Sequence, residues 1–164
     1  MKKLALLLAF ATVACGGPGD SAPQTAEQTD VINNSPASIA EARFAESLGI
    51  NLADFQSNET GLHWRDIVVG EGPVVEAGQT VSAHYTGWLP DGTQFETSRG
   101  GTPISFAVGT GRVIEGWDKG LLGMRVGGTR QLLIPGALAY GPRAMGPIPA
   151  NATLIFTVEV VSAQ

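Results

Sequence analysis

The sequence is poor in the residues on which metalloproteins and disulfide-bonded proteins depend. Its 164 residues include one Cys and two His. A single Cys excludes an internal disulfide framework and a multi-cysteine metal site. The net charge is −5 and no basic block occurs, so nucleic acid is not an expected partner. The apolar run Leu4–Val13 has ten residues, whereas a membrane-spanning helix needs about 20.

Glycine and proline, in contrast, are abundant. The chain has 22 Gly and 10 Pro, and most of the glycines lie between Gly61 and Gly146. Frequent turn residues favour short strands over a helix bundle. Hydrophobic residues make up 43% of the chain, which excludes a disordered polyelectrolyte as its overall description.

The start of the chain has the features of an export signal. A positively charged beginning precedes the apolar run, and Ala14 precedes the only cysteine, Cys15. This order resembles a bacterial lipoprotein signal, which implies removal of residues 1–14 and acylation of Cys15. Gly16 after the Cys implies the outer membrane, with the domain facing the periplasm or the cell surface. A plain secretory signal with an incidental Cys is the alternative.

A linker and a short extension follow. Residues 15–37 comprise Cys15 and a stretch without aromatic residues. Such a stretch cannot bury enough apolar surface to offset the entropy lost on ordering, so we predict a flexible linker. Ser38–Glu41 fits a capping box, and Gly49 can end a helix. We therefore predict a helix at Ile39–Leu48, within an extension of residues 38–60. We expect this helix to pack onto the domain or onto a second copy. Its short length favours a monomer.

The remaining residues, 61–164, are predicted to form one α+β domain. Turn signals separate the runs typical of strands. These are Leu62–Val69, Thr80–Trp88, Thr93–Thr97, Ile104–Phe106, Thr129–Ile134 and Thr153–Val161. Only Val113–Leu122 has a helical pattern. The prediction is an antiparallel sheet curled around one short helix, and the chain lacks the glycine motifs of nucleotide-binding folds.

The residues that could carry chemistry are few. His63 and His84 lie in predicted strands without the spacing of a metal site, and no serine has the GxSxG surroundings of a hydrolase nucleophile. No metal or cofactor is therefore expected. Trp117 lies in the predicted helix and Tyr140 in a predicted loop, and aromatic residues in such places are typical of a concave binding site.

Several motifs, in order and at matching spacing, resemble one family. They are VSAHYTGWL at 81–89, DGTQFETS at 91–98, VIEGW at 113–117, LAYG at 138–141, IPAN at 148–151 and ATLIF at 152–156. Together they are similar to the FKBP-type peptidyl-prolyl isomerases over about residues 61–163. The resemblance implies a five-stranded antiparallel half-barrel wrapped around one short helix.

The resemblance also implies the residues of a binding pocket. The catalytic residues that it implies are Tyr85, Phe95, Glu96, Trp117 and Tyr140, and the substrate-binding residues are Phe106, Val113, Ile114, Ile148 and Phe156. Two features depart from the family. Glu96 stands where the family usually has Asp, and the flap Gly141–Pro149 is shorter than usual.

The expected function is acceleration of X–Pro isomerisation in unfolded or exported proteins, without cofactor or metal. An apolar pocket favours the twisted amide over the planar one, because twisting removes the amide resonance. Macrolide inhibitors are further expected ligands, and a lipid bilayer is an expected partner through Cys15. Two alternatives stay open: a chaperone or peptide-binding module whose isomerase pocket is vestigial, and a purely structural surface lipoprotein.

Overall fold

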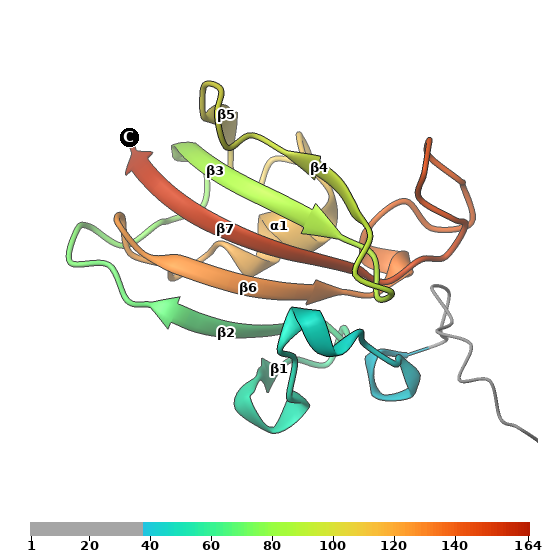
Figure 1. Ribbon diagram of the computed structural model, residues 1–164. Helices are drawn as coiled ribbons and strands as arrows, with labels where there is room; N and C mark the ends of the chain where they lie inside the picture. Colours follow the sequence, from blue (N-terminus) through green and yellow to red (C-terminus); the bar gives the residue numbers. More distant parts are fainter. Residues whose placement is uncertain (1–37) are drawn as a thin grey trace, which may run out of the picture. The chain divides into compact units, whose positions relative to one another are not determined.

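A computed structural model describes residues 38–164, which form one antiparallel sheet around a short helix (Figure 1). The strands are β1 (Gln56–Ser57), β2 (His63–Val68), β3 (Thr80–Trp88), β4 (Gln94–Thr97), β5 (Ile104–Ala107), β6 (Thr129–Ile134) and β7 (Leu154–Ala163). Their order is β1-β2-β6-β7-β3-β4, and β5 also pairs with β3. The predicted signal, Cys15 and the linker lie outside the described residues. No helix within residues 38–164 is long and apolar enough to cross a membrane.

The predicted fold class is confirmed, and the sheet is open rather than closed. It has seven strands instead of five for two local reasons. The runs predicted separately at Thr93–Thr97 and Ile104–Phe106 form β4 and β5, which pair with different parts of β3. The two-residue β1 belongs to the extension and adds to the outer edge of β2.

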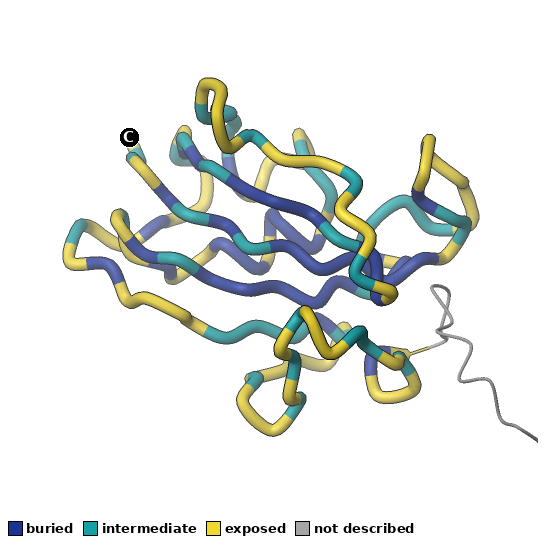
Figure 2. The backbone as a smooth tube through the Cα atoms, in the orientation of Figure 1, coloured by how far each residue is buried: buried dark blue, intermediate teal, exposed yellow. Residues whose placement is uncertain are grey.

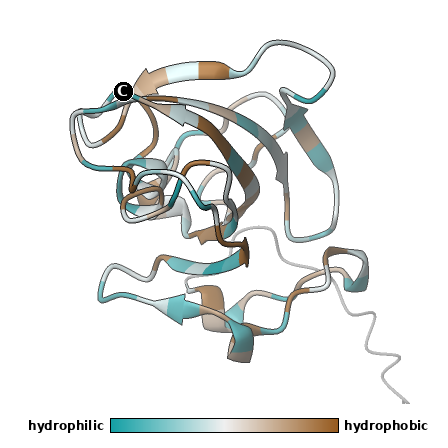
Figure 3. Ribbon diagram, turned by 90° about the vertical axis from the view of Figure 1, so that its left-hand side faces the viewer, coloured by the Kyte–Doolittle hydropathy of each residue, from teal (hydrophilic) through white to brown (hydrophobic). Residues whose placement is uncertain are grey.

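Strand β3 pairs with β7 on one side and with β4 and β5 on the other, and its side chains alternate in polarity. Val81, Ala83 and Tyr85 are buried, whereas Ser82 and His84 between them are partly exposed. The alternation places apolar side chains on the face that carries the helix, as expected for a strand with one face on the core. Figure 3 shows hydrophobic and hydrophilic residues interspersed along the strands of the sheet.

The helix α1 (Glu115–Gly120) crosses the concave face of the sheet and is shorter than the predicted Val113–Leu122. Gly116 and Gly120 lie against β6. A Cβ on Gly116 would overlap side-chain carbons of Ile134, and one on Gly120 would stand 2.7 Å from a side-chain carbon of Leu132. The glycines that weaken the helix propensity thus allow α1 to approach the sheet closely.

Strand β6 is buried on both faces, since the extension covers the face that α1 does not (Figure 2). Leu133 and Ile155 on the outer face form a second apolar cluster with Ile39. Phe44, Leu48, Ile50, Leu52, Phe55 and Trp88 are packed against this cluster. The extension therefore packs onto the domain.

The predicted continuous helix Ile39–Leu48 is wrong. The segment forms two 3-10 turns, η1 (Ile39–Glu41) and η2 (Glu46–Leu48), and a third turn, η3 (Leu52–Asp54), follows. Ala42 has extended backbone angles, and Ser38 makes no side-chain cap. Tertiary contacts override the local preference, because the Ala45 N–H donates to the Pro90 carbonyl at 2.7 Å. Gly49 does end η2 in the left-handed conformation.

Candidate active site

A pocket of about 530 Å³ opens on the concave side of the sheet, next to α1. It is bounded by strands β3, β4, β5 and β7, by the loop before α1 and by the segment after η4 (Gly136–Leu138). Its lining residues are Tyr85, Glu96, Ile104, Arg112, Val113, Ile114, Glu115, Trp117, Ala139, Tyr140 and Phe156.

Aromatic rings pack around Trp117. Its ring centroid lies 5.0 Å from that of Tyr85, 5.2 Å from Phe156 and 5.4 Å from Phe106. Phe95 packs edge-on against Phe156 at 5.6 Å. Offset and edge-on ring pairs are each favourable by about 0.5–1.5 kcal/mol beyond area burial, so the pocket floor is held rigidly. Trp117 Nε1 has no hydrogen-bond partner within the described residues.

One wall of the pocket is polar. The Tyr85 hydroxyl donates a hydrogen bond to the Glu96 carboxylate. Burial, then this hydrogen bond, then the negative charge of Glu96 raise the pKa of Tyr85 from 10.0 to about 12, and Tyr140 adds to the effect. Burial and the charge of Glu96 also raise the pKa of Tyr140. Both phenols are therefore neutral donors at physiological pH.

The loop before α1 brings Val113 and Ile114 to the pocket. Gly109 and Gly111 in this loop have φ of 75° and 71°, values that suit glycine. Their N–H groups donate to the two carboxylate oxygens of buried Asp118, at 2.8 and 2.7 Å. The N–H of Ile114 makes no backbone hydrogen bond within residues 38–164. The loop is thus fixed from behind, and one backbone donor stays available.

The flap, Gly141–Pro149, follows Tyr140. Its base is closed by the Asn151 N–H, which donates to the Gly141 carbonyl at 2.7 Å. Ile148 pairs with Met145 in an isolated bridge, and its side chain is only 6% exposed. Ile148 packs into the main core and is absent from the pocket lining, whereas Met145 in the middle of the flap is exposed.

The structure brings together most of the residues singled out in the sequence. Those in the lining are Tyr85, Glu96, Val113, Ile114, Trp117, Tyr140 and Phe156. Phe95 and Phe106 stand behind the lining and touch it through their rings. Ile148 is also absent from the lining, because it is buried in the main core.

Four lining residues were missed by the sequence reasoning. They are Ile104, Arg112, Glu115 and Ala139. Strand alternation could have found Ile104, because it stands two residues before Phe106 on the same strand. Arg112 and Glu115 flank Val113 and Ile114, but their charge gave no reason to place them at an apolar pocket.

Comparison with known proteins shows similarity to a single family. A family model described as FKBP-type peptidyl-prolyl cis-trans isomerase matches residues 72–161. The FK506-binding protein of Streptomyces anulatus is 48% identical over 115 residues, which are 66% of this chain and 93% of that protein. The FK506-binding protein 4 of Gibberella zeae is 50% identical over 96 residues, 58% of this chain. The match spans only 19% of that longer fungal protein.

Among solved structures, the crystal structure of AtFKBP13 is similar with a TM-score of 0.63 and 40% identity. The similarity covers 67% of this chain and 98% of that one. The family match extends over more than half of the chain and includes most residues of the pocket. The chain therefore belongs to the FKBP-type peptidyl-prolyl cis-trans isomerase family.

Proposed function

We propose that this protein accelerates cis–trans isomerisation of X–Pro bonds in exported proteins, without covalent chemistry. The observation that carries the proposal is the aromatic pocket around Trp117, with two neutral tyrosines in its lining whose pKa values are both raised in part by the Glu96 carboxylate. Such a site can hold a prolyl ring on its floor and present hydrogen-bond donors to the flanking carbonyls.

The reaction needs no nucleophile, since its barrier comes from amide resonance. X–Pro bonds interconvert in tens to hundreds of seconds when uncatalysed, over a barrier of about 20 kcal/mol. A twisted amide has lost its resonance and carries less charge on its carbonyl oxygen. An apolar pocket binds this state better than the planar state, and each tenfold acceleration requires about 1.36 kcal/mol of such preference.

The residues have distinct roles in this proposal. Trp117 forms the floor, and Phe156 forms part of the wall of the prolyl site. The Ile114 N–H and the Tyr140 hydroxyl bind substrate carbonyls. Glu96 orients Tyr85 through their hydrogen bond. A rapamycin-class macrolide would occupy the same apolar site and compete with peptide.

We also propose that acylated Cys15 anchors the protein to the bacterial outer membrane, with the domain facing the periplasm. The support is the sequence order alone, in which a charged start, an apolar run and a small residue precede the Cys. Two or more acyl chains would hold the protein firmly, because each buried CH₂ contributes about 0.8 kcal/mol. Metabolic labelling with a fatty-acid probe should mark the protein, and Cys15→Ser should abolish the label.

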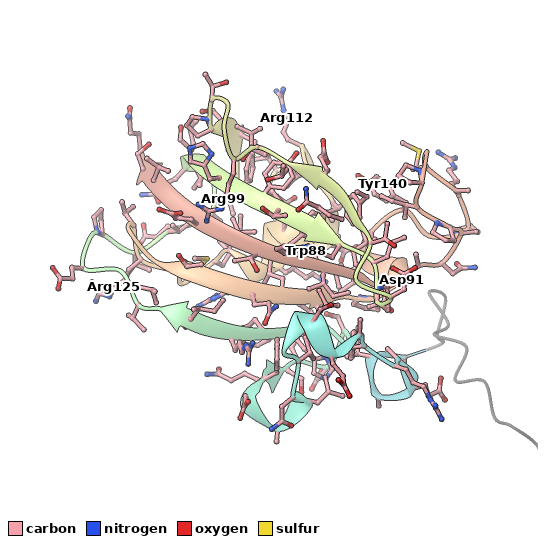
Figure 4. All side chains as sticks on the ribbon, in the orientation of Figure 1. Trp88, Asp91, Arg99, Arg112, Arg125 and Tyr140 are labelled. Atoms are coloured by element: carbon pink, nitrogen blue, oxygen red, sulfur yellow. The ribbon has the colours of Figure 1, made fainter. Side chains whose placement is uncertain are left out.

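A prolyl isomerisation assay with the full chain and a short Leu-Pro peptide tests the proposed activity. We expect acceleration, inhibition by a rapamycin-class macrolide, and a loss of at least tenfold in kcat/KM for Trp117→Phe. The matched control is Trp88→Phe, because Trp88 packs on the outer face of the sheet and is absent from the pocket lining (Figure 4).

The outcomes separate the proposal from its alternative. Equal activity of the two tryptophan variants would place catalysis outside the pocket. A folded protein that binds peptide or macrolide but gives no acceleration would favour the peptide-binding module. In that case Glu96→Asp, which restores the residue usual in the family, is the informative variant.

A further inference from the structure

The pocket lining includes an arginine that the mechanism above does not use. Arg112 is the one basic side chain among the lining residues, all of which lie in the described part of the chain. Two carboxylates, Glu96 and Glu115, share the lining with it.

Both carboxylates have partners. The Glu115 Oε1 lies 2.6 Å from the Lys119 Nζ, one turn further along α1. Glu96 accepts the hydrogen bond of the Tyr85 hydroxyl. In contrast, none of the ion pairs formed within residues 38–164 includes Arg112.

The backbone of Arg112 is fixed although its side chain is exposed. The residue follows Gly111, whose N–H is bound to the Asp118 carboxylate at 2.7 Å, and it precedes Val113 in the lining. Figure 4 shows the Arg112 side chain reaching from this loop into solvent. Arg112 thus contributes to the pocket lining with an exposed side chain, which can reach the residues next to a bound proline.

We propose that Arg112 is a specificity-determining residue that favours substrates with an acidic residue next to the proline. The inference rests on the proposed isomerase function. The chain as a whole is acidic, with a net charge of −5, and therefore repels acidic peptides at long range. A local, unpaired guanidinium reverses this preference at the site itself.

The expected effect is modest because the pair is exposed to water. An exposed ion pair contributes little interaction free energy, so we expect a change of only roughly two- to fivefold in kcat/KM. The attraction acts on the ground state and the transition state alike, so the change appears in KM rather than in kcat. Salt screens exposed charges, so the preference should shrink as ionic strength rises.

The test compares peptides with Glu, Gln or Lys immediately before the proline, and a second set with the same residues immediately after it. The full chain should process the Glu peptide of at least one set with a kcat/KM about two- to fivefold above that of its Gln counterpart. Arg112→Gln should abolish the difference, and Arg112→Lys should retain it. Arg112→Glu should reverse it.

The matched control is Arg125→Gln, which removes the same charge from an exposed arginine outside the pocket lining (Figure 4). It should leave the preference intact. Equal rates for Glu and Gln peptides in both sets, a preference for Lys, or a preference that survives in Arg112→Gln would overturn the proposal. Failure of the isomerase function itself is distinguishable, because the wild type would then not accelerate the Gln peptides either.

Discussion

The buried carboxylate of Asp118 accepts a hydrogen bond of 2.7 Å from the backbone N–H of Gly111, and this contact ties α1 to the rim of the pocket. The other oxygen accepts the Gly109 N–H at 2.8 Å. One side chain on the helix thus satisfies two backbone donors of the loop that carries Val113 and Ile114. Positions in the lining therefore depend on a residue that does not line the pocket itself.

The first prediction concerns this anchor. Asp118→Asn should lower the free energy of unfolding by about 1–3 kcal/mol, since the amide offers one acceptor where the carboxylate offers two and leaves one N–H of the loop without its charged acceptor. Isomerase activity should fall with it, because the loop loses its support. Urea denaturation and the peptide assay provide the measurements.

Asp54→Asn is the control: its exposed carboxylate lies 3.7 Å from Arg65, and its loss should cost less than about 1 kcal/mol. Equal losses in the two variants would contradict the anchoring role.

The second prediction concerns the two tyrosines, the only ones in the sequence. The pKa of Tyr85 is raised to about 12 and that of Tyr140 is raised as well, so little tyrosinate absorbance should appear at pH 10 in the folded protein. The unfolded chain loses these protons near pH 10. Between pH 10 and about 12 the unfolded state therefore binds fewer protons, and stability should fall as pH rises.

Two variants check the causes of these shifts. Tyr85→Phe should remove the ionisation near pH 12 and make the decline in stability shallower. Glu96→Gln should lower the pKa of Tyr85 and of Tyr140, since it removes the negative charge that acts on each of them. Half-ionisation of both phenols at pH 10 in the folded wild type would show that the polar wall is arranged differently.

The third prediction concerns Gly87, near the end of β3. A Cβ at this position would stand 2.6 Å from Phe95 Cζ and 2.8 Å from Phe156 Cε1. Rings cannot bend away as flexible side chains do, so Gly87→Ala should destabilise the fold by about 1–3 kcal/mol and distort the pocket wall. Thermal unfolding and macrolide binding are the measurements. Gly101→Ala should leave both unchanged, because the nearest atom to its Cβ lies 3.7 Å away.

The fourth prediction concerns the extension. Ile39 is 2% exposed in the cluster on the outer face of the sheet. Ile39→Ala should lower the free energy of unfolding by about 2–4 kcal/mol, as expected for a large-to-small change in a core. Ile67→Ala is the matched control, because Ile67 is 51% exposed on β2 and should change stability by less than about 0.5 kcal/mol. If both variants unfold at the same urea concentration, the extension does not contribute to the folded domain.

Much of the fold could be predicted from local patterns. The structure contains the strands predicted by the alternating polarity of β3 and by the apolar run of β6, and β6 has its predicted bounds. It also contains the turn at Pro90–Gly92 that joins β3 to β4. These signals are readable because strand polarity has a period of two residues and turns need particular residues. The pocket residues were placed by resemblance to a family, since no spacing rule brings Tyr85, Trp117 and Tyr140 together.

The sequence by itself determined the strand positions, the turn chemistry and the class of the domain, since each follows from the properties of neighbouring residues. Only the tertiary structure decided that Ile39–Leu48 forms separate turns, that Ile148 enters the core and that Arg112 lines the pocket. These outcomes depend on contacts between residues far apart in the chain, such as the hydrogen bond from Ala45 to Pro90. Local propensities amount to fractions of a kcal/mol per residue, so such contacts override them.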